Sequence, residues 1–218
     1  MKPITIDIVR HGETFLNVLD RMQGWCDYDL NERGRRQARI TGQALANRHY
    51  DLVVSSDLRR ATQTRDLIVE MLKFRPAKVE ADRQFREMCF GVFEGLDSDE
   101  TWAKIAHQFG YQNQSDIMKH RGMTGALNLL HQADSTKESD DAASLSHRWS
   151  AGIFDIIQNV QPGGRVLIVT HGTFIRALAE ELGVDTLHNY PVNAGVTTVQ
   201  TDSLGKLTLI EYNHHFGE

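Results

Sequence analysis

Two histidines each follow a run of apolar, mostly β-branched residues and precede a glycine. His11 comes after Arg10 and before Gly12, and His171 is followed by Gly172. Apolar runs bounded by glycine are typical of buried strands. Ligands bind at the carboxyl ends of such strands in open α/β sheets. We therefore expect His11 and His171 to lie in one crevice, where an arginine can hold an anion and a histidine can attack it.

A third apolar run, residues 52–55, leads into a turn that carries Arg59 and Arg60. If the three runs are neighbouring parallel strands, an arginine joins the two histidines. The glycines let backbone N–H groups approach a ligand, and helices that begin there direct their positive ends at it. A single histidine at a strand end is usually structural, so the repetition of the pattern carries the prediction of a functional site.

Hydrophobic periodicity predicts strands that alternate with helices. The expected strands cover residues 4–9, 51–55, 165–170, 196–201 and 207–212, with a short one near Val79. This alternation predicts an α/β fold, a three-layer α/β/α sandwich with a mainly parallel central sheet. The pattern loosens over residues 96–146, which we interpret as a mostly helical insertion over the active site. The whole chain, 1–218, is then one domain with this insertion as its lid.

Composition limits the classes of partner. The 218 residues include 24 basic and 29 acidic side chains, a net charge of −5, which creates no broad field for nucleic acid or an anionic membrane. No stretch resembles a signal peptide or approaches the roughly 18 apolar residues of a membrane span. Cys26 and Cys89 lack metal-type spacing and predict reduced thiols in a cytoplasmic protein without a metal. The hairpin near Asp202 has an edge strand that allows a homodimer.

Further motifs stand in a fixed order along the chain. They are Arg10-His11-Gly12-Glu13-Thr14, Asn17, Gly24-Trp25, Leu30-Asn31-Glu32-Arg33-Gly34, Ser55-Ser56-Asp57-Leu58-Arg59-Arg60-Ala61-Thr62-Gln63-Thr64, Arg86-Glu87-Met88, Phe90-Gly91, Glu94-Gly95 and Thr170-His171-Gly172. Together they resemble the histidine phosphatase superfamily, also called the phosphoglycerate mutase-like family, of the branch 1 type. The resemblance covers about residues 4–95 and 145–213.

The resemblance implies that His11 is a nucleophile that forms a phosphohistidine. His11 must attack as a neutral imidazole, so its other ring nitrogen should donate to a backbone carbonyl. Arg10, Arg60 and His171 would surround the phosphoryl oxygens. The family pattern selects Arg60 rather than its neighbour Arg59 for this position.

The resemblance also implies a proton donor and further substrate contacts. Glu87 would protonate the leaving oxygen and then take a proton from the attacking water. Burial would raise the pKa of Glu87 and nearby cations would lower it, so the sequence leaves the direction of the shift open. Asn17, Gly24 and Gly172 complete the expected substrate-binding residues.

The segment after Glu87 favours a phosphatase over a mutase. Mutases of this family usually carry basic residues there, and a glutamate-tyrosine pair, whereas residues 91–100 are acidic and Phe90 follows Cys89. We expect a phosphomonoesterase of small phosphorylated metabolites. The alternative is a phosphoglycerate mutase primed by 2,3-bisphosphoglycerate, the one case that needs a cofactor. Basic residues within 96–146 are candidate contacts for a second acidic group, or simply a solvated face: Lys104, Lys119, His120 and Arg121.

Two hypotheses from other classes compete with this one. In a metal-dependent hydrolase, His11 and His171 would be ligands, but acidic or histidine partners at metal spacing are missing and the arginines would repel the ion. In a non-catalytic module, the pocket would only bind phosphorylated ligands. The complete set of candidate catalytic residues speaks against the second hypothesis.

Overall fold

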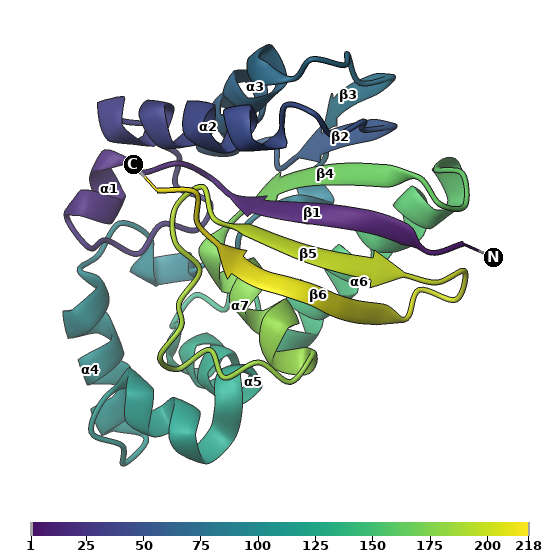
Figure 1. Ribbon diagram of the computed structural model, residues 1–218. Helices are drawn as coiled ribbons and strands as arrows, with labels where there is room; N and C mark the ends of the chain where they lie inside the picture. The colour runs from purple at the N-terminus through teal and green to yellow at the C-terminus, as the bar shows by residue number, and fades with distance from the viewer. Residues whose placement is uncertain (1, 218) are drawn as a thin grey trace.

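The computed structural model describes residues 2–217 and has a six-stranded sheet at its centre (Figure 1). The strands are β1 (Ile4–Arg10), β2 (Leu52–Ser55), β3 (Lys78–Ala81), β4 (Arg165–Thr170), β5 (Val196–Thr201) and β6 (Leu207–His214). Their order in the sheet is β3-β2-β4-β1-β5-β6. The pairs β3-β2, β2-β4 and β4-β1 are parallel, and β5 is antiparallel to both β1 and β6. The predicted mainly parallel sheet is confirmed.

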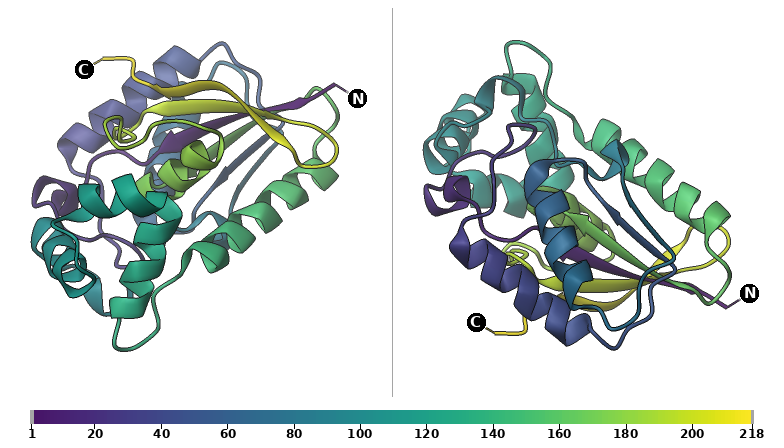
Figure 2. Two further views of the ribbon diagram at one scale, coloured as in Figure 1. Left: turned by 90° about the horizontal axis from the view of Figure 1, so that it is seen from below. Right: turned by 90° about the horizontal axis from the view of Figure 1, so that it is seen from above.

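Helices cover both faces of this sheet. They are α1 (Phe15–Val18), α2 (Glu32–Leu45), α3 (Arg59–Met71), α4 (Ser98–Gln108), α5 (Gln114–Ala133), α6 (Ala142–Asn159) and α7 (Gly172–Glu181), with short 3₁₀ turns at Arg83–Phe85 and Gly91–Phe93. Helices α2 and α3 lie on one side of the sheet, and α6 and α7 lie on the other (Figure 2). This arrangement confirms the predicted three-layer α/β/α architecture.

Alternation along β1 divides the core between the two faces. Ile6 and Ile8 belong to the cluster of buried side chains that includes Phe174 of α7, whereas Val9 packs with Ile68 of α3 on the opposite face. Successive side chains of a strand point to opposite faces, so a strand buried on both sides must be apolar at nearly every position. The sheet is thereby fixed in one register, which sets the relative heights of its strand ends.

The helical insertion packs at the end of the sheet where the parallel strands finish. Asp97 caps α4 by accepting a hydrogen bond from the Glu100 N–H at 3.0 Å. The Met22 N–H donates to the Leu96 carbonyl at 2.8 Å, which ties the start of the insertion to the loop after α1. Figure 1 shows α4 and α5 on the same side of the molecule as α1 and the strand ends. Throughout residues 2–217, no helix combines the length and apolar character needed to cross a membrane.

Candidate active site

The two histidines lie side by side at the ends of neighbouring strands. The register pairs Arg10 of β1 with Thr170 of β4, so the next residue in each strand, His11 and His171, reaches the same height. Their ring centroids are 5.2 Å apart, and the planes are inclined by 58°. Both side chains are buried. The strand β2, whose end leads to α3, is the other neighbour of β4, as the predicted crevice requires.

The ring of His11 is held in one orientation by the backbone. Its Nδ1 lies 2.8 Å from the Gly12 carbonyl, so Nδ1 carries the proton and donates it, and Nε2 keeps its lone pair. Burial lowers the pKa of His11 well below its usual value, and the charges of Arg60 and Arg10 add to this effect. His11 is therefore a neutral imidazole with Nε2 available for attack.

The turn after His11 depends on Gly12. A Cβ at this position would collide with the carbonyl of Gly34 at the start of α2. The Gly12 N–H donates to the Thr64 hydroxyl of α3 at 2.9 Å. The loop is thus packed directly between two helices, which restricts movement of the neighbouring imidazole.

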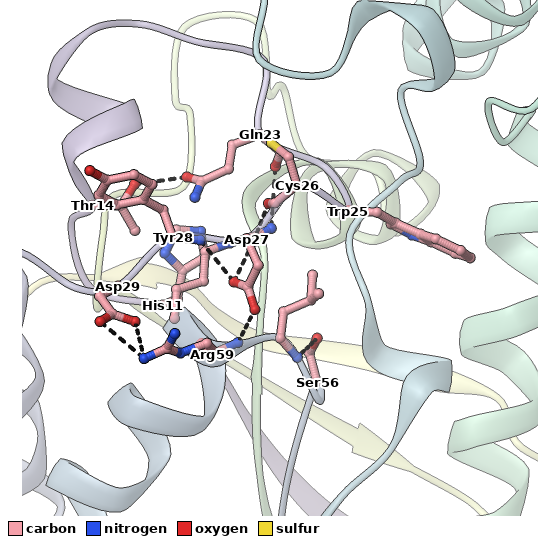
Figure 3. Close-up of polar contacts among 12 residues, drawn as sticks. His11, Thr14, Gln23, Trp25, Cys26, Asp27, Tyr28, Asp29, Ser56 and Arg59 are labelled. Atoms are coloured by element: carbon pink, nitrogen blue, oxygen red, sulfur yellow. Dashed lines mark hydrogen bonds and ion pairs between the residues drawn. The ribbon is translucent and has the colours of Figure 1, made fainter.

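Arg60 is buried, whereas its neighbour Arg59 lies outside the site. The side chain of Arg60 has 0% exposure, and that of Arg59 has 67%. Arg59 pairs with Asp29 at 3.0 Å, and its backbone N–H donates to Asp27 at 2.6 Å (Figure 3). Arg60 donates to the carbonyls of Gly24 at 2.7 Å and Cys26 at 3.1 Å. The loop around Gly24 therefore fixes the direction of the Arg60 guanidinium.

Glu94 in turn fixes this loop. Its carboxylate accepts hydrogen bonds from the N–H groups of Gly24 at 3.0 Å, Trp25 at 2.7 Å and Cys26 at 3.0 Å. A Cβ at Gly24 would collide with the carbonyl of Met88, so only glycine fits there. Gly24, expected to bind substrate, does not line the cavity, and its N–H and carbonyl are both engaged within the protein. Its structural contribution is to hold Arg60.

The carboxylate of Glu87 lies at the start of α7. Its oxygens accept hydrogen bonds from the N–H groups of Thr173 at 2.8 Å, Phe174 at 3.0 Å and Met88 at 2.9 Å. Burial nevertheless raises the pKa of Glu87, because the loss of hydration outweighs these donors and the charge of Arg60. The pKa shift of Glu87, whose direction the sequence left open, is thus upward.

Several buried donors near His11 have no hydrogen-bond partner within residues 2–217. They are Nε of Arg10, Nε of Arg60 and Nε2 of Gln23, together with the ring nitrogens of His171, one of which carries a proton in the neutral ring. Unsatisfied buried polar atoms are rare in proteins, so a group of them beside one side chain needs a reason. Burial, followed by the charges of Arg60 and His11, lowers the pKa of His171 well below its usual value. Two cations and uncharged polar groups thus surround His11, an environment that suits an anion with several oxygens.

Asn17 and Gln23 belong to one hydrogen-bonded group on the cavity wall. Thr14 caps α1 and donates to Oε1 of Gln23 at 2.8 Å (Figure 3). Asn17 Nδ2 lies 3.4 Å from the same oxygen, which leaves Gln23 Nε2 as a donor toward the cavity. Asn193 donates to the carbonyl of His11 at 3.0 Å and to Asn17 at 3.3 Å. These amides connect the loop after β1 to the segment before β5.

The site opens into a cavity of about 420 Å³. Five of the expected site residues line this cavity: Arg10, His11, Asn17, Glu87 and Gly172. Arg60 and His171 lie behind this lining, against His11. The insertion contributes Ser98, Asp99, Trp102, Gln114 and Met123, so it does reach the site. None of Lys104, Lys119, His120 and Arg121 lines the cavity.

The structure adds residues that the motifs did not predict. Gln23, Arg176, Tyr190 and Asn193 also line the cavity. Arg176 carried a signal in the sequence, because a charged residue interrupts the buried face of a helix that otherwise presents Phe174 and Leu178. Tyr190 and Asn193 lie in an irregular segment, where no periodicity indicates which side chains face inward. In the described part of the chain, no three His, Cys, Asp or Glu side chains are grouped so that they could hold a metal ion.

Comparison with known proteins gives a consistent result. A sequence model of the histidine phosphatase superfamily (branch 1) matches residues 6–214. The chain is 31% identical over 192 residues to the 2,3-bisphosphoglycerate-dependent phosphoglycerate mutase of Hamiltonella defensa subsp. Acyrthosiphon pisum (strain 5AT), covering 79% of this chain and 75% of that protein. It is 31% identical over 175 residues to the uncharacterized phosphatase PhoE of Bacillus subtilis (strain 168), covering 80% and 75%. The crystal structure of phosphoglycerate mutase from Bacillus anthracis str. Sterne matches with a TM-score of 0.88 at 31% identity, covering 98% of this chain and 94% of that one.

Proposed function

Because the chain belongs to the histidine phosphatase superfamily (branch 1), we propose that it is a phosphomonoesterase acting through a phosphohistidine on His11. Members of this family are enzymes, and both phosphatases and phosphoglycerate mutases are among the relatives of this chain. The observation that carries the proposal is the group of unpartnered buried donors around the neutral imidazole of His11. An imidazole nucleophile surrounded by donors suits phosphoryl transfer, since positioning and charge stabilisation supply most of its catalysis.

In the first step, Nε2 of His11 attacks phosphorus. The N–P bond forms while the bond from phosphorus to the alcohol oxygen breaks, and that oxygen takes a proton from Glu87. Arg10 and Arg60 stabilise the charge on the phosphoryl oxygens, with Gln23, Asn17, His171 and the Gly172 N–H as further donors. The raised pKa of Glu87 supports its part, because the carboxyl keeps its proton to a higher pH than an exposed glutamate does.

In the second step, water replaces His11 on phosphorus. A bond from the water oxygen to phosphorus forms, the N–P bond breaks, and Glu87 takes the proton of the water. His11 returns to its neutral form and inorganic phosphate leaves. The reaction uses only groups of this chain and water, so the proposal includes no metal and no cofactor.

A phosphoglycerate mutase is the second candidate, because the relatives at 31% identity include proteins with that name. Such an enzyme would need 2,3-bisphosphoglycerate as a primer and would return the phosphoryl group to its bound substrate. The acidic segment 91–100 favours the phosphatase, since it supplies no cation for a second phosphate. The proposed partner is a small phosphorylated metabolite rather than a nucleic acid or a membrane. The proposed location is the cytoplasm, where the free thiols of Cys26 and Cys89 would stay reduced.

One experiment tests the proposal and separates the candidates. The purified protein is mixed with ³²P-labelled substrate, quenched in alkali and assayed for acid-labile label on the chain. Label that depends on His11 supports the phosphohistidine, and binding without label would indicate a non-catalytic module. Incubation with 3-phosphoglycerate, with and without 2,3-bisphosphoglycerate, distinguishes the enzymes: a phosphatase releases inorganic phosphate, whereas a mutase forms 2-phosphoglycerate and depends on the bisphosphate.

A further inference from the structure

Arg176 is a buried cation without an acidic partner. It lies on α7, one turn after the segment that binds Glu87, and only 6% of its surface is exposed. Its Nε lies 3.3 Å from the hydroxyl of Thr186. Across residues 2–217, no carboxylate lies within 4.0 Å of its guanidinium, and its two terminal nitrogens donate no hydrogen bond. Burying an unpaired charge is costly, so this arrangement is unusual for a purely structural arginine.

The nearest acidic residue of the same helix is already engaged. Glu180 accepts a hydrogen bond from the Met123 N–H at 2.6 Å, on the side of α5. Burial lowers the pKa of Arg176, and the opposing effects of Tyr190, Tyr212 and Glu180 do not compensate. The guanidinium therefore has unused capacity to hold an anion.

Arg176 faces the same cavity as the proposed phosphate site. The guanidinium carbons of Arg10 and Arg176 each lie 5.2 Å from the centroid of the Tyr190 ring, so they are at most twice that distance apart. Both arginines and Tyr190 line the cavity with His11. A ligand with a phosphate on the Arg10 side can therefore place a second group at Arg176 across a short carbon skeleton.

A carboxylate suits the position beside Arg176 better than another phosphate does. A planar guanidinium meets both oxygens of a carboxylate at once. The phosphate site has two arginines and several neutral donors, whereas the second position has one arginine beside a tyrosine. Asp20, Arg21 and Asp99 also line the cavity. The two carboxylates would repel a phosphate dianion more strongly than a carboxylate, and Arg21 offsets only one of these two charges.

We propose that Arg176 is a specificity-determining residue that binds a substrate carboxylate, so that the site selects small phosphomonoesters of carboxylic acids. This inference rests on the proposed phosphatase function. Arg176 takes the place of the basic residues of the insertion, which the sequence offered as contacts for a second acidic group of the substrate. Lys104 is exposed and faces Glu100 at 3.8 Å, and Arg121 donates to the hydroxyl of Tyr111 at 2.6 Å.

The test compares 3-phosphoglycerate with glycerol 3-phosphate, which share a three-carbon skeleton but differ in a carboxylate or a hydroxymethyl group. Binding to His11→Ala is measured by calorimetry, so that no turnover is required. A charged hydrogen bond predicts that the carboxylate increases affinity about 10- to 100-fold. Adding Arg176→Gln should remove most of this preference, and Arg176→Lys should keep part of it. Lys119→Gln, which removes an exposed cation from the insertion, should leave the preference unchanged.

Equal affinity of the two ligands for the protein with Arg176 intact would overturn the inference, whatever the variants do. So would a carboxylate preference that survives Arg176→Gln. Circular dichroism and thermal melting show whether each variant is folded. If Arg176→Gln does not fold, the comparison of the two ligands on the protein with Arg176 intact decides the question. Hydrolysis of p-nitrophenyl phosphate by the wild-type protein tests the proposed function separately. Hydrolysis without a carboxylate preference rejects only the role of Arg176, and an Arg176-dependent preference without a phosphohistidine rejects only the proposed enzyme.

Discussion

The guanidinium of Arg148 donates to the backbone carbonyl of Glu87 at 3.1 Å. The same side chain donates to the Arg86 carbonyl at 2.6 Å and pairs with Asp140 at 2.7 Å. Arg148 comes from α6, which begins in the last residues of the insertion and packs against the sheet. The position of the proposed proton donor therefore depends on a helix that contributes no residue to the cavity lining.

Arg148→Gln should lower kcat by about 10- to 100-fold, because small displacements of a catalytic group have effects of this size. Arg148 does not line the cavity, so KM should change little. Steady-state kinetics with an alkyl phosphate measure the two constants separately. Arg36→Gln, which removes an exposed arginine of α2, is the matched control. A parallel rise in KM with constant kcat would show that Arg148 acts on binding instead.

His11→Ala should abolish phosphatase turnover, by more than about 10⁴-fold, since removal of a nucleophile eliminates the covalent route. The fold should survive, because the ring lies at a strand end rather than within the apolar core. Release of inorganic phosphate and ³²P labelling measure the loss. His147→Ala, at an exposed position on α6, should keep full activity. Retention of activity by His11→Ala would exclude the phosphohistidine mechanism.

Glu87→Gln should slow the hydrolysis of alkyl phosphates much more than that of p-nitrophenyl phosphate. An alkoxide is a poor leaving group and needs a proton, whereas p-nitrophenolate leaves without one. Rates for the two substrates, measured with the same enzyme preparation, give the ratio directly. An equal loss for both substrates would indicate that Glu87 positions the phosphate instead of transferring a proton.

The pH dependence of kcat/KM should follow the groups of the free enzyme whose pKa values are shifted, Glu87 and His11. Burial raises the pKa of Glu87, so the protonated form persists as pH rises, and alkyl phosphate hydrolysis falls only as pH passes this raised value. The pKa of His11 is well below its usual value, so the nucleophile stays neutral as pH falls through 6.5. Glu87→Gln should remove the alkaline decline. A decline that persists in this variant would have to come from another group.

The sequence predicted the elements that repeat a local pattern, and it missed contacts between distant segments. His11 and His171 were predictable because apolar strands, histidines and glycines are adjacent in the chain. Selecting Arg60 over Arg59 required the family resemblance, and the structure explains the choice by burial against the loop at Gly24. The direction of the Glu87 pKa shift depends on burial against three backbone donors, which no local pattern contains.

Arg176 and Tyr190 show the other limit of sequence reasoning. Arg176 interrupts an apolar helix face, but its lack of a carboxylate partner depends on α5, α7 and the segment before β5 together. Tyr190 lies in an irregular segment that the antiparallel pairing of β5 with β1 brings to the site. Substrate selection is therefore the property least accessible from the motifs, because they describe the phosphate site and not its surroundings.

Asp7 should stabilise the fold without contributing to activity. Its buried carboxylate lies in the middle of β1, where it accepts from Tyr50 at 2.7 Å and Thr198 at 2.9 Å and pairs with Arg48 at 2.9 Å and Arg165 at 2.7 Å. Burial opposes ionisation, but the two arginines and the hydrogen bonds hold the pKa of Asp7 below its usual value. Removing one partner of a buried ionic group costs several kcal/mol. Because Arg48 and Arg165 are each about one-third exposed, we expect Asp7→Ala to lower the free energy of unfolding by about 3 kcal/mol.

The sign of the pH dependence distinguishes this ionic contribution from simple packing. A carboxyl whose pKa is lowered by folding stabilises the protein above its unfolded pKa, and this stabilisation is lost as pH falls through the folded value. The difference between wild type and Asp7→Ala in urea unfolding should therefore be largest near pH 7 and shrink in acid. Tyr50→Phe removes one hydrogen bond to the carboxylate but leaves both arginines, so it should cost about 2 kcal/mol, with a pH dependence of the same sign but smaller than that of Asp7→Ala. A difference that stays constant between pH 7 and pH 3 would mean that the volume of Asp7 matters and its charge does not.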